Sequence, residues 1–462
     1  MKSTATDGIL PDTDTAVKRP CALLWDESFL WGVMAWKALS EAGLPFVPVR
    51  SEDIRKGGLS RYRMVFVPGG WASNKIAALG EQGREEIRRF VAAGGSYLGI
   101  CGGAGMATKN GLGLLSIRRR ATAERVPSFS GPIRLSQNAH EIWRNVDVPV
   151  FNAWWPSQFQ IDDPAIRVLG RYDDPLPDAF SSDIRVADGN TGDWTALEKA
   201  YGILLNPARL SGEPAVVEGS FGCGRVVLSL VHFDTPGDRN GSVVLRNLWS
   251  YLSCGDHRPA GVKSAPARFG RGLPRKVAEM TAELQAKVRE LIAIGAGQSL
   301  WYWRNPLLLQ WRRGVRGLEY STLAVMIGEI AESLGNPAAS DPETPAQLPA
   351  PLDPAVVEEE LLGIREGLFA FCEKARGLLV REKQSMSREP LSPTVCADEE
   401  ISRLRGELFG SAMSHGGDFK RLIDAVDRLL YKLIVNGLAV STGPCFRPPR
   451  IYAGGASVPS RV

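Results

Sequence analysis

The sequence lacks the features typical of secreted, membrane-spanning or zinc-binding proteins. Its seven cysteines are widely scattered and include no C-x-x-C pair, which argues against a disulfide framework and a structural zinc site. No run of about 20 apolar residues is present, and the first 20 residues hold no apolar core of signal-peptide length. We therefore expect a cytoplasmic protein in a reducing compartment, with no membrane association, no metal and no other cofactor.

Strong net charge and abundant histidine are also missing. The 55 Lys and Arg residues are nearly balanced by 51 Asp and Glu residues, so a net charge of +4 gives no reason to expect nucleic-acid binding. Hydrophobic residues fill 44% of the 462 positions, enough for a sizeable core in two domains or in one large domain with appendages. Only four histidines are available for acid–base chemistry, so each position is informative.

The most informative stretch is a short apolar run, residues 97–100, that ends on Cys101 between glycines. The spacing Gly-x-Cys-x-Gly is that of a nucleophile elbow, in which a sharp turn after a buried strand exposes the central side chain. A helix that begins at the cysteine favours the thiolate, the species that attacks a carbonyl carbon. A buried, unreactive cysteine in a glycine-rich strand end fits the pattern equally well.

Strand and helix patterns alternate around this stretch. Short apolar runs predict strands at 22–25, 46–49 and 64–67. Residues 81–93 have apolar side chains at helical spacing and predict a crossover helix before Cys101. This alternation predicts an α/β fold with a doubly wound, mostly parallel sheet. Ligands of such sheets bind at the carboxyl ends of the strands, where both Gly69 and Cys101 would lie.

A second set of candidate site residues follows a predicted hairpin. Residues 216–220 and 225–231 have the pattern of two strands around a glycine-rich turn, and the second strand ends directly before His232. A cysteine nucleophile needs an imidazole to take its proton and a carboxylate to orient that imidazole. We therefore predict a triad of Cys101, His232 and Asp234. The alternative is a strand-end histidine that pairs with a loop acid for structural reasons alone.

Four motifs in order resemble the class I glutamine amidotransferase-like fold. They are Pro-Gly-Gly at 68–70, Gly-Ile-Cys-Gly-Gly at 99–103, Gly-Leu-Gly-Leu-Leu at 111–115 and His-Phe-Asp at 232–234. Within this fold the chain is most similar to the amidotransferase-like domain at the N-terminus of biotin-protein ligases. The resemblance covers about residues 20–254.

The resemblance implies a role for each matching residue. Cys101 is the expected nucleophile, His232 the base and Asp234 the orienting acid. The N–H groups of Gly70 and Gly102 are expected to form the oxyanion hole, because glycine lets the main chain approach the developing alkoxide. The residues expected to line the substrate pocket are Gly69, Gly103, Asn152, Trp154 and Trp155. The two tryptophans have packing alone as an alternative role.

Two positions depart from the family pattern. Glutaminases of the family carry glutamine four residues after the nucleophile, where this chain has Gly105. They also carry glutamate in a His-Pro-Glu sequence, where this chain has Asp234 after His232 and a phenylalanine. We therefore predict that free glutamine is a poor substrate.

The second half of the chain has mostly helical patterns. Amphipathic helices are predicted at 276–294, 299–311, 320–334, 355–383, 400–408 and 419–435. A ligase catalytic domain needs a large mixed sheet, so we expect none here. The predicted organisation is a disordered tail at 1–19, an amidotransferase-like domain at 20–254, a linker at 255–275, a helical domain at 276–440 with a Pro-rich linker at 336–354, and a disordered tail at 441–462.

Two functions are compatible with these patterns. The first is a thiol-dependent hydrolase or amidotransferase that acts on a small-molecule or peptide amide, or on a related acyl substrate. The second is a non-catalytic amidotransferase-like module that binds a ligand or scaffolds an assembly. In either case the helical region is a candidate surface for a protein partner.

Overall fold

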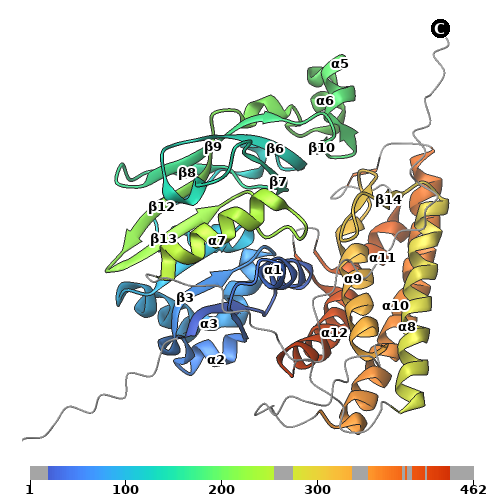
Figure 1. Cartoon of the computed structure of the whole chain (residues 1–462). Helices are drawn as coiled ribbons and strands as arrows, with labels where there is room; N and C mark the ends of the chain where they lie inside the picture. Colours follow the sequence, from blue (N-terminus) through green and yellow to red (C-terminus); the bar gives the residue numbers. More distant parts are fainter. Residues whose placement is uncertain are drawn as a thin grey trace, which may run out of the picture.

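The structure, a computed structural model, describes residues 19–253, 274–335, 352–387, 391–392, 398–411 and 414–436. The predicted tail at 441–462, the predicted tail at 1–19 except Arg19, and most of both predicted linkers, 255–275 and 336–354, lie outside these residues. A half built around a sheet, from β1 to α7, lies beside a helical half that begins with α8 (Figure 1).

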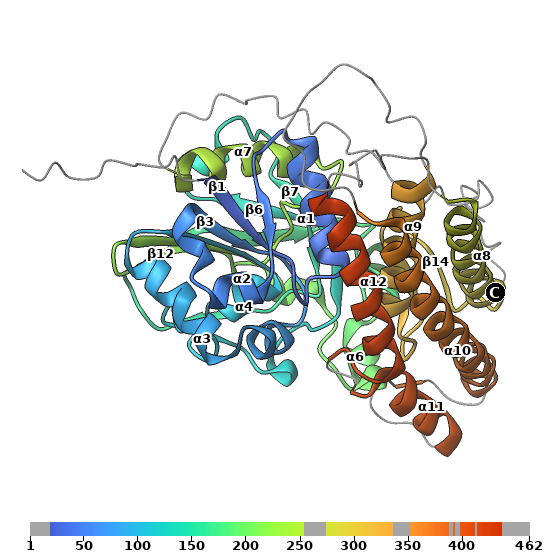
Figure 2. The same cartoon turned by 90° about the horizontal axis from the view of Figure 1, so that it is seen from below.

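Five neighbouring strands of the central sheet are parallel. Their order is β2 (Val47–Val49), β1 (Arg19–Leu24), β3 (Tyr62–Val67), β4 (Ser96–Ile100) and β13 (Gly224–Ser229). One face is covered by α1 (Leu30–Glu41) and α7 (Arg239–Ser253), the other by α2 (Ser51–Arg55), α3 (Ala72–Ala92) and α4 (Gly102–Met106) (Figure 2). Strand β4 is buried along its whole length, as expected for a strand covered on both faces. The predicted doubly wound α/β fold is confirmed.

The sheet continues beyond β13 with antiparallel strands. Strands β12 (Pro214–Phe221) and β13 form the predicted hairpin, whose turn contains Gly222 at φ 59°. The other strands and the helices of this region are β9 (Arg167–Pro175), β6 (Phe129–Gln137), β7 (Val150–Trp154), β10 (Phe180–Ser181), β11 (Ile184–Arg185), α5 (Val186–Thr191) and α6 (Trp194–Tyr201). A separate ribbon pairs β5 (Ile117–Arg119) with β8 (Phe159–Ile161).

The helical half confirms the prediction of a helical C-terminal region, with one correction. Its helices are α8 (Arg275–Gly297), α9 (Gly317–Gly335), α10 (Pro354–Met386), α11 (Glu399–Phe409) and α12 (Gly417–Val435). Residues 299–311, predicted as helix, form a hairpin of β14 (Trp301–Trp303) and β15 (Leu309–Trp311) instead. Asn305 explains the turn, because its side-chain oxygen accepts hydrogen bonds at 2.9 Å from the N–H groups of both Leu307 and Leu308.

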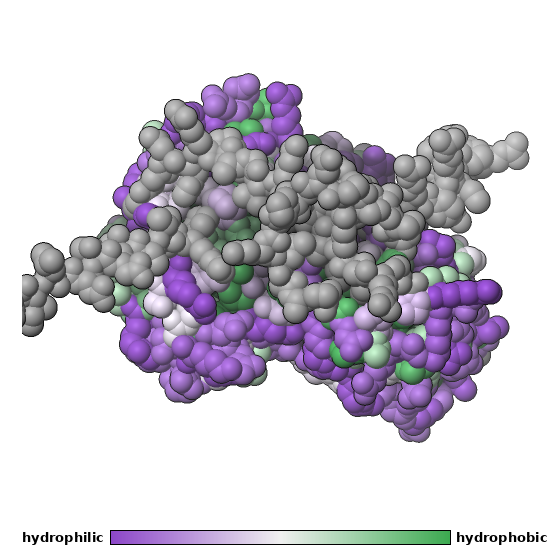
Figure 3. Space-filling view, turned by 60° about the horizontal axis from the view of Figure 1, so that its bottom comes forward, coloured by the Kyte–Doolittle hydropathy of each residue, from purple (hydrophilic) through white to green (hydrophobic). Residues whose placement is uncertain are grey.

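The surface of both halves is largely hydrophilic on the face seen in Figure 3. Among the residues that the structure describes, no helix has the length and apolar character needed to cross a membrane. Within the same residues, no group of three or more His, Cys, Asp or Glu side chains is placed to hold a metal ion.

The two halves pack together through α1 and α9. Ten of the twelve residues of α1 are buried, because this helix lies between the sheet and the helical half. Lys37 of α1 and Glu329 of α9 form an ion pair at 3.0 Å whose two side chains are almost fully buried. Burial raises the pKa of Glu329 to about 7, although Lys37 opposes this shift. The halves therefore share a hydrophobic core and this buried ion pair.

We expect Lys37→Met to lower the free energy of unfolding by about 3–5 kcal/mol, since Glu329 then lies buried without its cation. In this variant Glu329 keeps its proton in the folded state, whereas in the unfolded chain it loses the proton near its ordinary pKa. Stability should therefore fall as the pH rises from about 5 to about 7. Urea unfolding across this pH range tests the prediction. The double variant Lys37→Met/Glu329→Leu is the control and should recover most of the loss; a double variant as unstable as the single one would contradict it.

Candidate active site

Cys101 lies at the sharp turn between β4 and α4. Its backbone angles are φ 52° and ψ −106°, a conformation that a non-glycine residue rarely adopts. Its N–H donates a hydrogen bond to the carbonyl oxygen of Ser229 at 2.8 Å, which ties the turn to the end of β13. The thiol is partly exposed, and its Sγ lies 3.8 Å from the carbonyl oxygen of Trp154. The strand, turn and helix predicted around Cys101 are thus present, although α4 has only five residues.

Glycines allow the loop after β3 to pack against this turn. A Cβ atom on Gly102 would lie 1.8 Å from the carbonyl oxygen of Gly70, and one on Gly103 would lie 1.9 Å from that of Val67. The N–H of Gly103 donates to the carbonyl oxygen of Pro68 at 3.1 Å. Within the part of the chain that the structure describes, the N–H groups of Gly70 and Gly102 have no acceptor. The loop after β3 and the turn at Cys101 therefore each carry a free backbone donor.

His232 and Asp234 form a buried pair. The Nδ1 atom of His232 lies 2.8 Å from Oδ1 of Asp234, and both side chains are fully buried. Burial alone would lower the pKa of His232, but the charge and hydrogen bond of Asp234, and then the interaction with Cys101, raise it. Aspartate is one methylene shorter than the glutamate of the family pattern, yet its carboxylate reaches the imidazole. The structure therefore brings His232 and Asp234 together, and among the described residues the Nε2 atom of His232 has no hydrogen-bond partner.

The predicted pocket residues lie around this pair in different ways. The carbonyl oxygen of Asn152 accepts a hydrogen bond from the N–H of His232 at 2.7 Å, so Asn152 acts through its backbone. A Cβ on Gly69 would lie 3.2 Å from Cε1 of His232. Trp154 contacts the thiol through its carbonyl oxygen, whereas Gly103 is buried in the loop contact described above.

Trp311 and Arg304 of the helical half also pack against residues of the predicted pocket. Trp155, at φ 50°, stacks on Trp311 of β15 with ring centroids 5.1 Å apart. Another aromatic neighbour of Trp155 is Trp31 of α1, whose ring also packs on His232 with centroids 4.9 Å apart. The guanidinium group of Arg304 lies over the ring of Trp154 at 5.2 Å. Sequence reasoning missed Trp31, Arg304 and Trp311, because nothing local marks them as neighbours of Cys101.

Lys75 is a further residue that the sequence did not reveal. It is fully buried, and its ammonium group donates hydrogen bonds to the hydroxyl of Ser28 and the carbonyl oxygen of Asp26. Its Nζ lies 3.6 Å from where a Cβ on Gly70 would be. Burial lowers the pKa of Lys75 to about 7, and nearby acidic groups and Cys101 oppose this shift. Lys75 therefore places a buried amine, whose pKa lies near neutral pH, behind the loop that carries Gly70.

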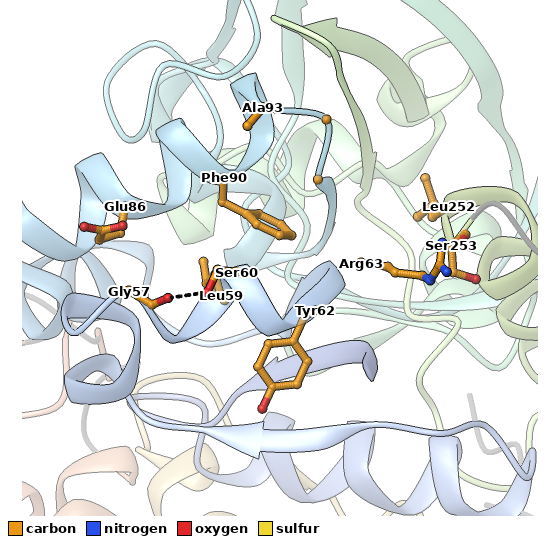
Figure 4. Close-up of a pocket in the computed structure, with 12 residues that line it drawn as sticks. Gly57, Leu59, Ser60, Tyr62, Arg63, Glu86, Phe90, Ala93, Leu252 and Ser253 are labelled. Atoms are coloured by element: carbon orange, nitrogen blue, oxygen red, sulfur yellow. Dashed lines mark hydrogen bonds between the residues drawn. The ribbon is translucent and has the colours of Figure 1, made fainter. Parts of the chain in front are cut away.

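Two of the hollows in the described part of the chain differ in their position relative to the triad. A pocket of about 380 Å³ is found at the opposite, amino-terminal ends of β3 and β4, between Arg63, Phe90 and Ser253 (Figure 4). It contains neither a cysteine nor a histidine. A larger cleft of about 990 Å³ lies between the halves and is bordered by Asn152, Trp154 and Arg304. Of these two hollows, only the cleft between the halves is lined by residues that contact His232 or Cys101, namely Asn152 and Trp154.

Part of the chain is similar to a known protein family. Residues 54–111 match the family described as biotin-protein ligase, N terminal. No curated protein matches the chain in sequence. Similar solved structures include PurLQS from Thermotoga maritima, at 17% identity and a TM-score of 0.37, over 51% of this chain and 99% of that one. A glutamine amidotransferase matches at 18% identity and a TM-score of 0.33, over 51% and 99%. A β-galactosidase from Bacillus circulans sp. alkalophilus matches at 14% identity and a TM-score of 0.31, over 50% and 31%.

Proposed function

We propose that this chain, whose residues 54–111 match the N-terminal family of biotin-protein ligases, is a thiol-dependent amidotransferase-like hydrolase of amides or related acyl compounds. The observation that carries the proposal is the partly exposed Cys101 at a strained turn, next to a fully buried His232–Asp234 pair. Strained backbone and a buried imidazole–carboxylate pair are both costly, and both are typical of catalytic sites.

Each group has a distinct role in the proposed reaction. The raised pKa of His232 favours an imidazolium beside a Cys101 thiolate, with the charge of Asp234 stabilising the cation. The thiolate attacks the acyl carbon, and the N–H groups of Gly70 and Gly102 receive the developing oxyanion. The C–N bond then breaks while His232 gives its proton to the leaving amine. Water attacks the thioester, His232 takes the proton of that water, and the C–S bond breaks to release the acid.

The test is ammonia or amine release from a panel of primary amides and peptide amides by the full chain. Activity should disappear in Cys101→Ser and fall by about 10²–10⁴-fold in His232→Ala, the range typical of a lost general acid–base group. Cys223→Ser is the matched control, because this exposed cysteine lies at the β12–β13 turn. Equal rates for the wild type and Cys101→Ser would instead favour the non-catalytic binding module.

Free glutamine is expected to be a poor substrate. Gly105 offers no side chain to bond the substrate, and a missing polar contact of this kind typically costs about 1–3 kcal/mol, or roughly tenfold to a hundredfold in rate. The measurement is ammonia release from glutamine, with Cys101→Ser as the blank. Turnover of about 1 per second or more that is absent from the blank would contradict this prediction and indicate a glutaminase.

A further inference from the structure

Arg119 and Arg125 flank Cys101, and the proposed mechanism uses neither. Arg119 ends β5 and packs on Gly105, four residues after the nucleophile: a Cβ on Gly105 would lie 3.2 Å from its Nη1 atom and 3.4 Å from its Cδ atom. The side chain of Arg119 is exposed. Among the described residues its guanidinium group has neither a hydrogen-bond acceptor nor an acidic partner. An unneutralised cation therefore occupies the space beside position 105.

Arg125 reaches the same region through the loop that contacts the thiol. Its Nη1 donates a hydrogen bond to the carbonyl oxygen of Pro156 at 2.9 Å. Two residues earlier in that loop, the carbonyl oxygen of Trp154 lies 3.8 Å from the Sγ atom of Cys101. Val126, the next residue, donates its N–H to Oε1 of Gln158 at 2.9 Å, and Arg119 pairs with the adjacent Phe159 in the β5–β8 ribbon, so both arginines lie at this end of the ribbon. Burial lowers the pKa of Arg125, and the charge of Arg119 lowers it further.

Tyr172 of β9 supplies a third polar group. Its side chain is 1% exposed, and in the described part of the chain its hydroxyl has no hydrogen-bond partner. The N–H of Tyr172 donates to the carbonyl oxygen of Glu213 at 2.9 Å, and the carboxylate of Glu213 pairs at 2.9 Å with Arg120, the residue after Arg119. This connects Tyr172 to the end of β5, and its hydroxyl interacts electrostatically with Cys101 and Arg125. A buried hydroxyl that lacks a partner is unfavourable, and the oxygen of a ligand would satisfy it.

We propose that Arg119, Arg125 and Tyr172 form a subsite for a carboxylate, and that the substrate is an amide whose acyl group carries this carboxylate. Guanidinium groups match the planar geometry of a carboxylate, and two of them repel an ammonium group nearby. The inference rests on the proposed function for the identity of the reaction. It predicts that glutaramate, which is glutamine without its ammonium group, is a better substrate than glutamine or than the neutral diamide glutaramide.

The decisive experiment compares two alkylating reagents on the full chain. Iodoacetate carries a carboxylate and iodoacetamide does not, and both need the same thiolate. The ratio of the two rates therefore does not depend on the fraction of the cysteine that is ionised. Peptide mass spectrometry should show a higher iodoacetate preference at Cys101 than at the exposed Cys223. This ratio should fall about tenfold in Arg119→Gln, as expected for one charge-assisted hydrogen bond.

Arg118→Gln is the matched control. Arg118 is the preceding residue of β5, but its guanidinium group pairs with Asp162 at 3.0 Å instead of approaching Gly105. The ratio should stay unchanged in this variant. If the ratio also stays unchanged in Arg119→Gln, with both rates unchanged, Arg119 has no role at this site. If both reagents slow equally in Arg119→Gln, Arg119 affects only the reactivity of the thiolate. Either result rejects the subsite.

Glutarate binding to Cys101→Ser separates this inference from the proposed function. Calorimetry on the full chain should detect binding that weakens about tenfold in Arg119→Gln and in Tyr172→Phe, with no change in Arg118→Gln. Such binding supports the subsite even if Cys101 proves unreactive, a result that would refute the hydrolase alone. Absence of glutarate binding, or equal binding in all variants, overturns the subsite.

Discussion

Iodoacetamide at neutral pH is expected to modify Cys101 at least about tenfold faster than the exposed Cys223, and His232→Ala should slow the reaction at Cys101 by about a hundredfold. The reason is the electrostatic interaction of the thiol with an imidazole whose pKa is raised by Asp234 and by Cys101 itself. An imidazolium partner stabilises the thiolate, which is the reactive species. Cys223 lies in a turn and has no such partner among the described residues.

The other cysteines of the described part provide internal controls. Cys21 and Cys372 are buried, and burial raises the pKa of both thiols, to about 12 in the case of Cys372. Both should remain unmodified until the chain unfolds. Site-resolved alkylation with peptide mapping measures all rates in one sample. Equal rates at Cys101 and Cys223 in the wild type would count against a catalytic role for Cys101.

Gly102→Ala is expected to have the second large effect. The added Cβ would lie 1.8 Å from the carbonyl oxygen of Gly70, a backbone atom that cannot move without shifting the loop after β3. Position 102 begins α4 in a helical conformation that alanine adopts readily, so the effect comes from this contact and not from backbone strain. We expect a loss of about 3 kcal/mol in the free energy of unfolding, typical of overpacking, together with loss of rapid alkylation at Cys101.

Gly363→Ala is the matched control for Gly102→Ala. Gly363 lies in α10, where an added Cβ has no atom of another residue within 4 Å. Alanine there should stabilise the helix by up to about 1 kcal/mol and leave alkylation unchanged. Urea unfolding measures the first quantity and peptide mapping the second. If Gly102→Ala behaves like this control, the contact between the turn and the Gly70 loop has no role in shaping the site.

Local sequence patterns were sufficient for much of the fold. Alternating apolar runs and amphipathic stretches predicted the parallel strands and their covering helices, because hydrophobic periodicity reflects which faces are buried. The glycines around Cys101 predicted the turn, since only small residues permit so close a backbone approach. The hairpin β14–β15 was missed, because its tryptophans and leucines also fit a helical face and only the side chain of Asn305 selects the turn.

Apart from His232 and Asp234, which motif order suggested, the surroundings of the thiol were decided by tertiary structure. The order of the strands places β13 beside β4, which brings His232 to Cys101. The same packing puts Lys75 behind Gly70 and brings Arg119 to Gly105. None of these pairs is marked by local spacing, because partners on different elements meet only through sheet order and loop path. The sequence by itself therefore determined the α/β fold and the turn that presents Cys101, whereas long-range packing decided which charges face it.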